Sequence, residues 1–167
     1  MLWETSAETE IVDGVEHRNV WMKDDPDVRR DALALGRRMT PPSRQFMPDV
    51  WAKNLCTIAY QDGNLVALAV IDLRYSKRVR ANMGYLRIFI APECRQRGIA
   101  IPLTLRAHEI IRRYSLANPE KRIGGTMALV TVKGMMDEPV GKAFMVLIGY
   151  SPKSEPVLVR WFDHYKL

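Results

Sequence analysis

The sequence has few cysteines and histidines, the residues that typically bind zinc. It has two cysteines among 167 residues, Cys56 and Cys94, at a spacing that fits no metal site. Nothing indicates secretion, so we expect both to be free thiols. The three histidines, His17, His108 and His164, lie far apart and form no ligand pair with a cysteine. We therefore expect no metal site.

Long apolar runs are also absent. No run approaches the roughly 20 apolar residues that cross a bilayer. Residues 1–14 are acidic and polar, which is typical of neither a signal peptide nor a transit peptide. We therefore expect a cytoplasmic protein without a membrane partner. We expect residues 1–14 to form an N-terminal segment, either mobile or folded against the body, and residues 15–167 to form a single domain.

Neither sign of charge is missing, but basic residues are in excess. The chain has 25 Lys and Arg against 19 Asp and Glu, a formal net charge of +6, which favours anionic partners. Three interpretations stay open: a phosphate-rich cofactor, RNA, and a basic surface that serves only solubility. The basic stretch 74–82 has Tyr75 as its only aromatic residue, which disfavours nucleic-acid binding.

Two glycine-rich nucleotide-binding motifs, G-x-x-x-x-G-K-[ST] and G-x-G-x-x-G, are missing as well. A different pattern occupies residues 85–111, where a β-prone run ends at Pro92 and apolar residues return at helical spacing after Gly98. The loop 95–100 meets the start of that helix, where unpaired N–H groups and the helix dipole favour phosphate. Gly98 lets the backbone approach a ligand closely. We therefore expect a phosphorylated cofactor held mainly by main-chain amides.

The rest of the chain alternates helical and β-prone runs. Asp24 or Asp25 precedes Pro26 as a helix cap, and Asp62-Gly63 is typical of a hairpin turn. This order predicts an α/β (α+β) domain with a mixed sheet. The expected helices are 26–39, 46–53, 99–116 and 139–147, the last stopped by Gly149, and the expected strands are 17–23, 55–60, 65–73, 83–90, 126–132 and 157–162.

The segment Ile90-Ala91-Pro92-Glu93-Cys94-Arg95-Gln96-Arg97-Gly98-Ile99-Ala100 resembles the cofactor motif V-x-P-x-x-R-x-x-G-I-G/A of the GNAT superfamily of acyl-CoA-dependent N-acyltransferases. The order of elements is also similar. Gly149-Tyr150 resembles the Gly-Phe or Gly-Tyr pair that ends the family's late helix. The resemblance spans about residues 20–162. It implies a single GNAT-like domain with a mixed central sheet of about six to seven strands, flanked by helices and splayed at the cofactor strand.

The resemblance also implies which residues bind acetyl-CoA, or another acyl-CoA, as co-substrate. Main-chain groups of Phe89 and Ile90 would bond the pantetheine arm in a gap beside the following strand, near Val130. An amide close to Ile90 would face the thioester oxygen, where negative charge grows during attack. Backbone amides of the loop would hold the pyrophosphate, namely those of Arg95, Gln96, Arg97, Gly98, Ile99 and Ala100.

One position departs from the family pattern. Many GNAT members have a tyrosine four residues before the Gly-Phe pair, and it protonates the departing thiolate. Here that residue is Met145, which cannot donate a proton. Tyr85, on the cofactor strand, and Tyr150 are the substitutes by proximity. The carboxylates of Asp72, on the preceding strand, and Glu93, in the loop, could pass protons through water.

These features predict an N-acetyltransferase that moves an acetyl or other short acyl group from acyl-CoA to a primary amine of a small molecule or peptide. Direct transfer is favoured over a covalent intermediate because no cysteine or serine sits beside a plausible histidine base. Two alternatives stay open. Met145 argues for a non-catalytic acyl-CoA-binding module or sensor, and the basic charge argues for acetylation of an aminoacyl-tRNA. Many members of that family dimerise, so a homodimer is one expected state.

Overall fold

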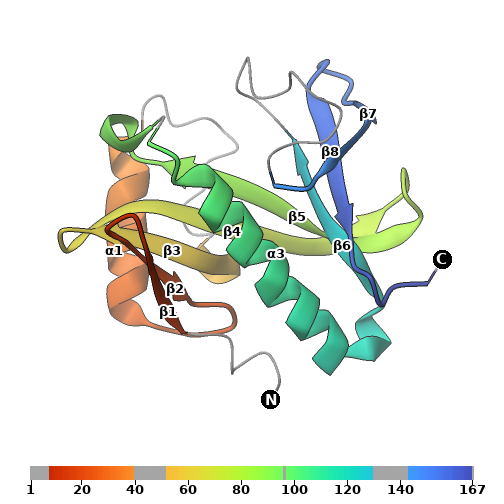
Figure 1. Ribbon diagram of the computed structural model, residues 1–167, viewed down its shortest axis with the longest axis horizontal. Helices are drawn as coiled ribbons and strands as arrows, with labels where there is room; N and C mark the ends of the chain where they lie inside the picture. The colour runs from red at the N-terminus through yellow and green to blue at the C-terminus, as the bar shows by residue number, and fades with distance from the viewer. Residues whose placement is uncertain (1–7, 40–51, 96, 130–142, 167) are drawn as a thin grey trace.

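The computed structural model describes residues 8–39, 52–95, 97–129 and 143–166. These residues form a sheet of eight strands flanked by helices (Figure 1), in the order β1-β2-β3-β4-β5-β6-β8-β7. Neighbouring strands are antiparallel except β5 and β6, which are parallel. The mixed sheet confirms the predicted fold class, with eight strands in place of six to seven. The strands are β1 (Thr9–Val12), β2 (Val15–Asn19), β3 (Leu55–Gln61), β4 (Asn64–Ser76), β5 (Ala81–Ile90), β6 (Ile123–Leu129), β7 (Val146–Tyr150) and β8 (Pro156–Trp161).

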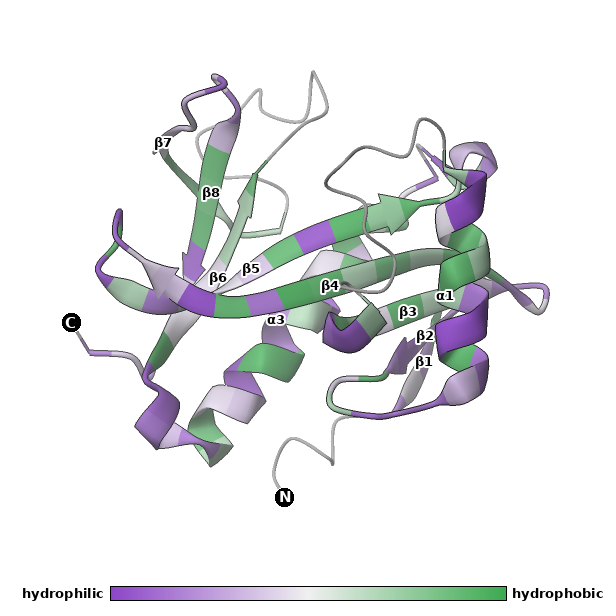
Figure 2. Cartoon of the chain, turned by 180° about the vertical axis from the view of Figure 1, so that it is seen from behind, coloured by the Kyte–Doolittle hydropathy of each residue, from purple (hydrophilic) through white to green (hydrophobic). Residues whose placement is uncertain are grey.

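Two helices cover opposite faces of the sheet. Helix α1 (Pro26–Arg38) packs on β4, and helix α3 (Ala100–Ala117) packs on β3, β5 and β6. Helix α3 lies in front of the sheet in Figure 1 and behind it in Figure 2, which looks from the other side. Both helices agree with the prediction to within one residue at each end. The predicted cap of α1 is also present, because the Asp25 side chain accepts hydrogen bonds from the N–H groups of Asp27 and Val28.

The basic stretch 74–82, which lies between the expected strands 65–73 and 83–90 and would therefore be a loop, is mostly strand. The hairpin at Asp62-Gly63 forms as predicted, but β4 continues to Ser76 and pairs there with Ala81, the first residue of β5. Only residues 77–80 make the turn. Ser76 and Ala81 are both buried, so sheet pairing extends the hairpin although the local composition is basic.

The predicted helix 139–147 is wrong at its described end. Residues 139–142 lie outside the described residues, and residues 146–150 form strand β7, which pairs with β8. Gly149 is therefore no helix stop. It lies inside the strand at φ 143°, where the register with β8 shifts, and glycine tolerates that irregularity. Val146, Leu147 and Ile148 alternate between exposed and half-buried positions, which is the period of a strand.

Other boundaries also differ from the prediction. The strand expected at 17–23 is β2, Val15–Asn19, and it ends four residues earlier. Residues 9–12, to which the sequence assigned no element, form β1 and pair with β2. Strand β6 starts at Ile123, before the predicted residue 126, because Gly124 and Gly125 let β8 and the residues after it approach closely. A Cβ atom on Gly125 would lie 2.2 Å from the Arg160 carbonyl oxygen. The predicted helix 46–53 lies outside the described residues except for its end, which belongs to the 3₁₀ turn Ala52–Asn54.

Candidate cofactor site

Strands β5 and β6 separate part-way along their length. Their pairing runs from Asn82↔Ile123 to Leu86↔Ala128, whereas β5 stays paired with β4 as far as Ile90. Figure 1 shows β5 running on toward the start of α3 while β6 diverges with β8. In the part of the chain that the structure describes, residues 87–90 have no partner strand on the β6 side. This is the splay predicted at the cofactor strand.

The pairing of β5 with β4 determines which peptide groups face the opening. The Ala91 N–H donates to the Val66 carbonyl at 2.7 Å. In an antiparallel pair, hydrogen-bonded positions alternate, so the register Leu68↔Phe89 directs the peptide groups of Phe89 toward β4. The peptide groups of Ile88 and Ile90 point the other way, into the opening. Sequence reasoning proposed Phe89 and Ile90 and missed Ile88, because strand register cannot be counted from one strand alone.

The loop after β5 brings the chain to the start of α3 with its amides exposed. Pro92–Cys94 form a 3₁₀ turn, and Cys94 is a buried free thiol beneath the loop. Gly98 has φ 76°, and apart from Gly98 itself and its two chain neighbours, no atom of the described residues lies within 4 Å of the position that a Cβ would take. No described side chain caps α3, so the first N–H groups of this helix have no partner within it. Such a helix start fits a phosphate group.

The predicted loop residues are placed as follows. Ile99 is the buried N-cap residue of α3, and Ala100 is its first helical residue. The side chains of Arg95 and Arg97 are exposed, and the Arg95 Nε donates to the Ile90 carbonyl at 3.4 Å. Gln96 lies outside the described residues.

Glu93 is held as a charged group beside this loop. Its carboxylate forms an ion pair with Arg38 of α1. Its own backbone N–H, and then Arg38, lower the pKa of the Glu93 carboxyl. A carboxylate stabilised in its charged form is a weak carrier of protons, which disfavours the proton-relay role considered for Glu93.

Tyr85 and Asp72 lie opposite each other on β5 and β4. The Arg74 guanidinium lies over the Tyr85 ring, 3.9 Å from its centroid, and its Nε is 3.6 Å from the Asp72 carboxylate. Both residues lie just before the point where β5 leaves β6. The structure thus brings together Tyr85 and Asp72 at the closed end of the splay.

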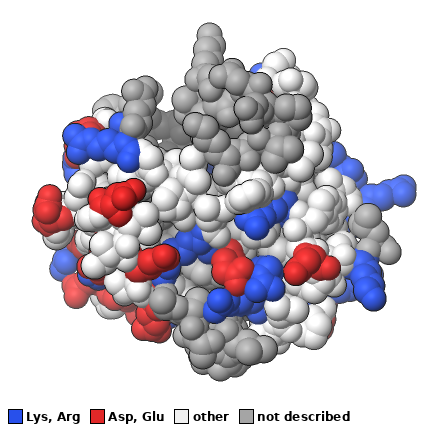
Figure 3. Space-filling model, in the orientation of Figure 1, with Lys and Arg blue, Asp and Glu red and all other residues white. Residues whose placement is uncertain are grey.

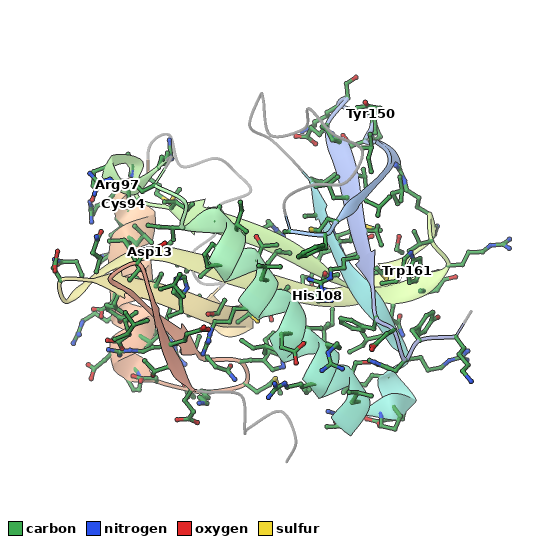
Figure 4. All side chains as sticks on the ribbon, in the orientation of Figure 1. Asp13, Cys94, Arg97, His108, Tyr150 and Trp161 are labelled. Carbon is green, nitrogen blue, oxygen red and sulfur yellow. The ribbon has the colours of Figure 1, made fainter. Side chains whose placement is uncertain are left out.

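Tyr150 lies on β7, and Met145, at the position where the family has its tyrosine, lies just before it. Met145 is buried and directly precedes Val146, which belongs to the same cross-strand row as Tyr85. Tyr150 is 58% exposed, and its carbonyl accepts a hydrogen bond from Arg78 in the β4–β5 turn. That turn is at the opposite end of β5 from the loop, about 30 Å away for ten residues of strand, and Figure 4 shows Tyr150 far from Arg97. Tyr150 is therefore not brought to the loop.

The structure does place hydroxyl groups beside histidines, contrary to the sequence argument for direct transfer. Ser115 Oγ is 3.1 Å from His164 Nε2, but the Ser115 hydroxyl donates to the Ile123 carbonyl at 3.0 Å. Thr126 Oγ1 is 2.7 Å from Nδ1 of His108, and both residues are buried. Because Ser115 uses its proton on a carbonyl and Thr126 is buried, neither pair forms an accessible nucleophile.

Charges on the face that carries α3 are mixed. Figure 3 shows Lys and Arg side chains interspersed with Asp and Glu on the face that carries α3. Much of this mixing is local pairing, as in the contacts of Arg112 and Arg113 with Glu109 and of Arg106 with Glu10. An interspersed pattern gives no single-sign stripe of the kind that follows a nucleic-acid backbone.

A mixed sheet that opens between its central parallel strands, beside the uncapped start of a long helix, is the arrangement of a GNAT-like fold. Comparison with solved structures agrees. The ribosomal-protein-S5-alanine acetyltransferase from Vibrio fischeri aligns with a TM-score of 0.59 at 9% identity, covering 95% of this chain and 99% of that one. A GNAT-family acetyltransferase from Streptococcus pneumoniae aligns with a TM-score of 0.55 at 15% identity, covering 89% and 99%.

A third similar structure is that of a GNAT-family acetyltransferase from Brucella melitensis in complex with acetyl-CoA. Its TM-score is 0.51 at 12% identity, and the alignment covers 92% of this chain and 91% of that one. These similarities establish the GNAT fold for this chain. No protein-family model matches the sequence, and no curated protein matches it significantly. Among the residues that the structure describes, no helix is both long and apolar enough to span a membrane.

Proposed function

We propose that this protein is an N-acyltransferase that moves an acetyl or other short acyl group from acyl-CoA directly to a primary amine of a small molecule or peptide. The observation that carries the proposal is the separation of β5 from β6 beside the uncapped start of α3. The similar Brucella melitensis structure holds acetyl-CoA, and the similar Vibrio fischeri protein is an alanine acetyltransferase. Both support this substrate pair.

The residues present fit the phosphate and amide groups of an acyl-CoA. Amides of Arg95 to Ala100 would bind the pyrophosphate at the start of α3, where Gly98 leaves open space. The peptide groups of Ile88 and Ile90 would bond the pantetheine arm as a neighbouring strand does. Acyl-CoA supplies an activated thioester carbonyl, and the Ile90 region would supply the donor for its oxygen.

Tyr85 and Asp72 are the residues proposed for proton transfer. An alkyl amine with a pKa near 10 is mostly charged at pH 7 and must lose a proton before attack. Asp72 would accept that proton through water, and the Tyr85 hydroxyl would donate one to the departing thiolate. Holding the two substrates together in the opening would supply much of the remaining rate.

Two glycines allow a matched test of acetyl-CoA binding. Gly98 and Gly63 both have φ 76° and open space where a Cβ would lie, but Gly63 lies in the β3–β4 turn. We expect Gly98→Trp to weaken acetyl-CoA binding, measured by calorimetry, by at least about tenfold, because the indole would fill the space proposed for the pyrophosphate at the start of α3. Gly63→Trp should bind like the wild type. Equal affinity in the two variants, or no binding by the wild type, would refute the cofactor site.

Met145 favours a second candidate, an acyl-CoA sensor without catalysis, because it occupies the usual position of the proton donor and is buried. One assay distinguishes the enzyme from the sensor. It follows CoA release over a panel of primary amines, and acetyl-CoA binding is measured in parallel. The proposed enzyme releases CoA with at least one amine. Binding without release for every amine would favour the sensor.

A further inference from the structure

The residues proposed for proton transfer lie on the sheet face opposite α3. Gly84 faces α3, because a Cβ on it would lie 3.5 Å from the Ile111 side chain. Side chains alternate along a strand, so Tyr85 faces the other way, and so does Asp72, which lies opposite it on β4. Figure 2 looks onto this face and shows α1 across the first part of β4. Asp72 lies beyond that part, where the buried run of β4 ends.

Asp72 and Arg74 present two opposite charges side by side on this face. The Arg74 Nε lies 3.6 Å from the Asp72 carboxylate, which is longer than a hydrogen bond. The side chain of Asp72 is 38% exposed and that of Arg74 is 54% exposed, so a solute reaches both charges. A carboxylate accepts about four hydrogen bonds and a guanidinium donates about five. Each group therefore keeps most of its hydrogen-bonding capacity for a ligand.

The Arg74 guanidinium is oriented by the aromatic ring beside it. It lies 3.9 Å from the centroid of the Tyr85 ring, and the attraction between a cation and an aromatic face favours this one arrangement over the many that a free arginine adopts. A planar guanidinium held in this way can bind a carboxylate through two parallel hydrogen bonds. The pair thus offers an oriented anion site directly beside an accessible carboxylate.

We propose that the acyl acceptor is an α-amino acid, which binds as a zwitterion with its ammonium group at Asp72 and its carboxylate at Arg74. This assignment rests on the proposed acyl transfer. The nitrogen and the carboxyl carbon of an α-amino acid are about 2.5 Å apart, which is comparable with the 3.6 Å between the two protein charges. The amine then lies beside the carboxylate proposed to accept its proton. Transfer forms an N–C bond, breaks the C–S bond, gives an N-acyl amino acid and the CoA thiol, and releases one proton to solvent.

Matched amines test this class of acceptor. For each side chain, three compounds are compared: the amino acid, its α-amide, and the amine that lacks the carboxyl group, as in leucine, leucinamide and 3-methylbutylamine. CoA release from acetyl-CoA is followed with each compound, and acetyl-CoA binding is measured in parallel. We expect kcat/KM for at least one amino acid to exceed that for its amide and its amine by at least about tenfold, because only the acid forms charge-assisted hydrogen bonds with Arg74.

Arg74→Gln tests the contact itself. Because Arg74 also orients the Tyr85 ring, this change lowers the rate for every acceptor, so the readout is the ratio of kcat/KM for an amino acid to that for its amide in the same variant. We expect this ratio to fall about tenfold in Arg74→Gln and to fall less in Arg74→Lys, which keeps the positive charge. Arg80→Gln changes an exposed arginine in the β4–β5 turn and should keep the wild-type ratio.

The outcomes separate the choice of acceptor from the proposed function. If amines without a carboxylate release CoA as fast as the amino acids do, the protein is an acyltransferase and the assignment of an α-amino acid is wrong. If the acids are preferred but Arg74→Gln keeps the wild-type ratio, the contact with Arg74 is wrong. If acetyl-CoA binds and no compound releases CoA, the proposed function fails and this acceptor fails with it.

Discussion

Tyr85 is the residue that we propose takes the place of the missing tyrosine. The usual donor position holds Met145, buried just before β7, while Tyr85 lies in the same cross-strand row on β5. The Arg74 guanidinium over its ring holds the ring in one orientation. Tyr150, the other substitute named from the sequence, lies on β7, and its carbonyl accepts a hydrogen bond from Arg78 in the β4–β5 turn.

Removing only the hydroxyl of Tyr85 tests this assignment. Tyr85→Phe keeps the ring under Arg74 and deletes the proton donor. We expect kcat for acetyl transfer to fall about 10- to 100-fold, at the low end of general acid catalysis because CoA thiolate is a good leaving group. KM for acetyl-CoA should stay unchanged. Tyr75→Phe, which changes an exposed tyrosine on β4, is the control, and an unchanged kcat in Tyr85→Phe would exclude the role.

At the scale of elements, the sequence predicted what depends on local chemistry. The Asp25 cap, the Asp62-Gly63 hairpin and the helix after Gly98 all follow from residue types at fixed local spacing, and all three are present. Strand β7 was missed because β8 decides its conformation. Whether the peptide groups of Phe89 or those of Ile88 face the β5–β6 opening also depends on strand pairing, so it can be decided only from the register of β5 with β4.

The register of β5 leads to a prediction for single amides. We expect acetyl-CoA to slow hydrogen exchange at the Ile88 and Ile90 N–H groups by at least about tenfold, because these amides face the opening and gain acceptors there. The Arg87 and Phe89 amides already bond β4 and serve as internal controls. The exchange rates of these four amides are measured by NMR with and without acetyl-CoA. If acetyl-CoA slowed all four equally, the register would be wrong.

At the scale of the whole molecule, the folded structure lowers the pKa values of two side chains, His108 and Glu109. His108 belongs to α3 and is buried against Phe162, with its Nδ1 hydrogen-bonded to Thr126. Burial, and next the charge of Arg160, lower the pKa of His108 to about 4. The ion-paired Arg112, opposed by partial burial and aided by Arg113, lowers the pKa of Glu109 to about 2. Both groups therefore make the fold sensitive to acid, in different pH ranges.

The contribution of His108 to stability is lost in a defined pH window. Above pH 6.5 the ring is neutral in both the folded and the unfolded chain, so it adds no pH dependence. Between pH 6.5 and 4 the unfolded chain binds a proton that the folded chain excludes, so the free energy of unfolding falls as pH falls. From pH 7.5 to 4.5 this one group should remove about 2 to 3 kcal/mol.

His108→Gln removes this titration. The free energy of unfolding, measured by urea denaturation, should then fall by about 2 kcal/mol less between pH 7.5 and 4.5 than it does in the wild type. The variant should be less stable at neutral pH because it loses packing on Phe162. His164→Gln, which changes a more exposed ring, is the control and should keep the wild-type slope. The Glu109 carboxylate loses its contribution below its ordinary range, from about pH 4.5 toward 2, so it does not mask the His108 window. A wild-type slope in His108→Gln would mean that the buried ring takes up its proton in the folded state as readily as in the unfolded chain.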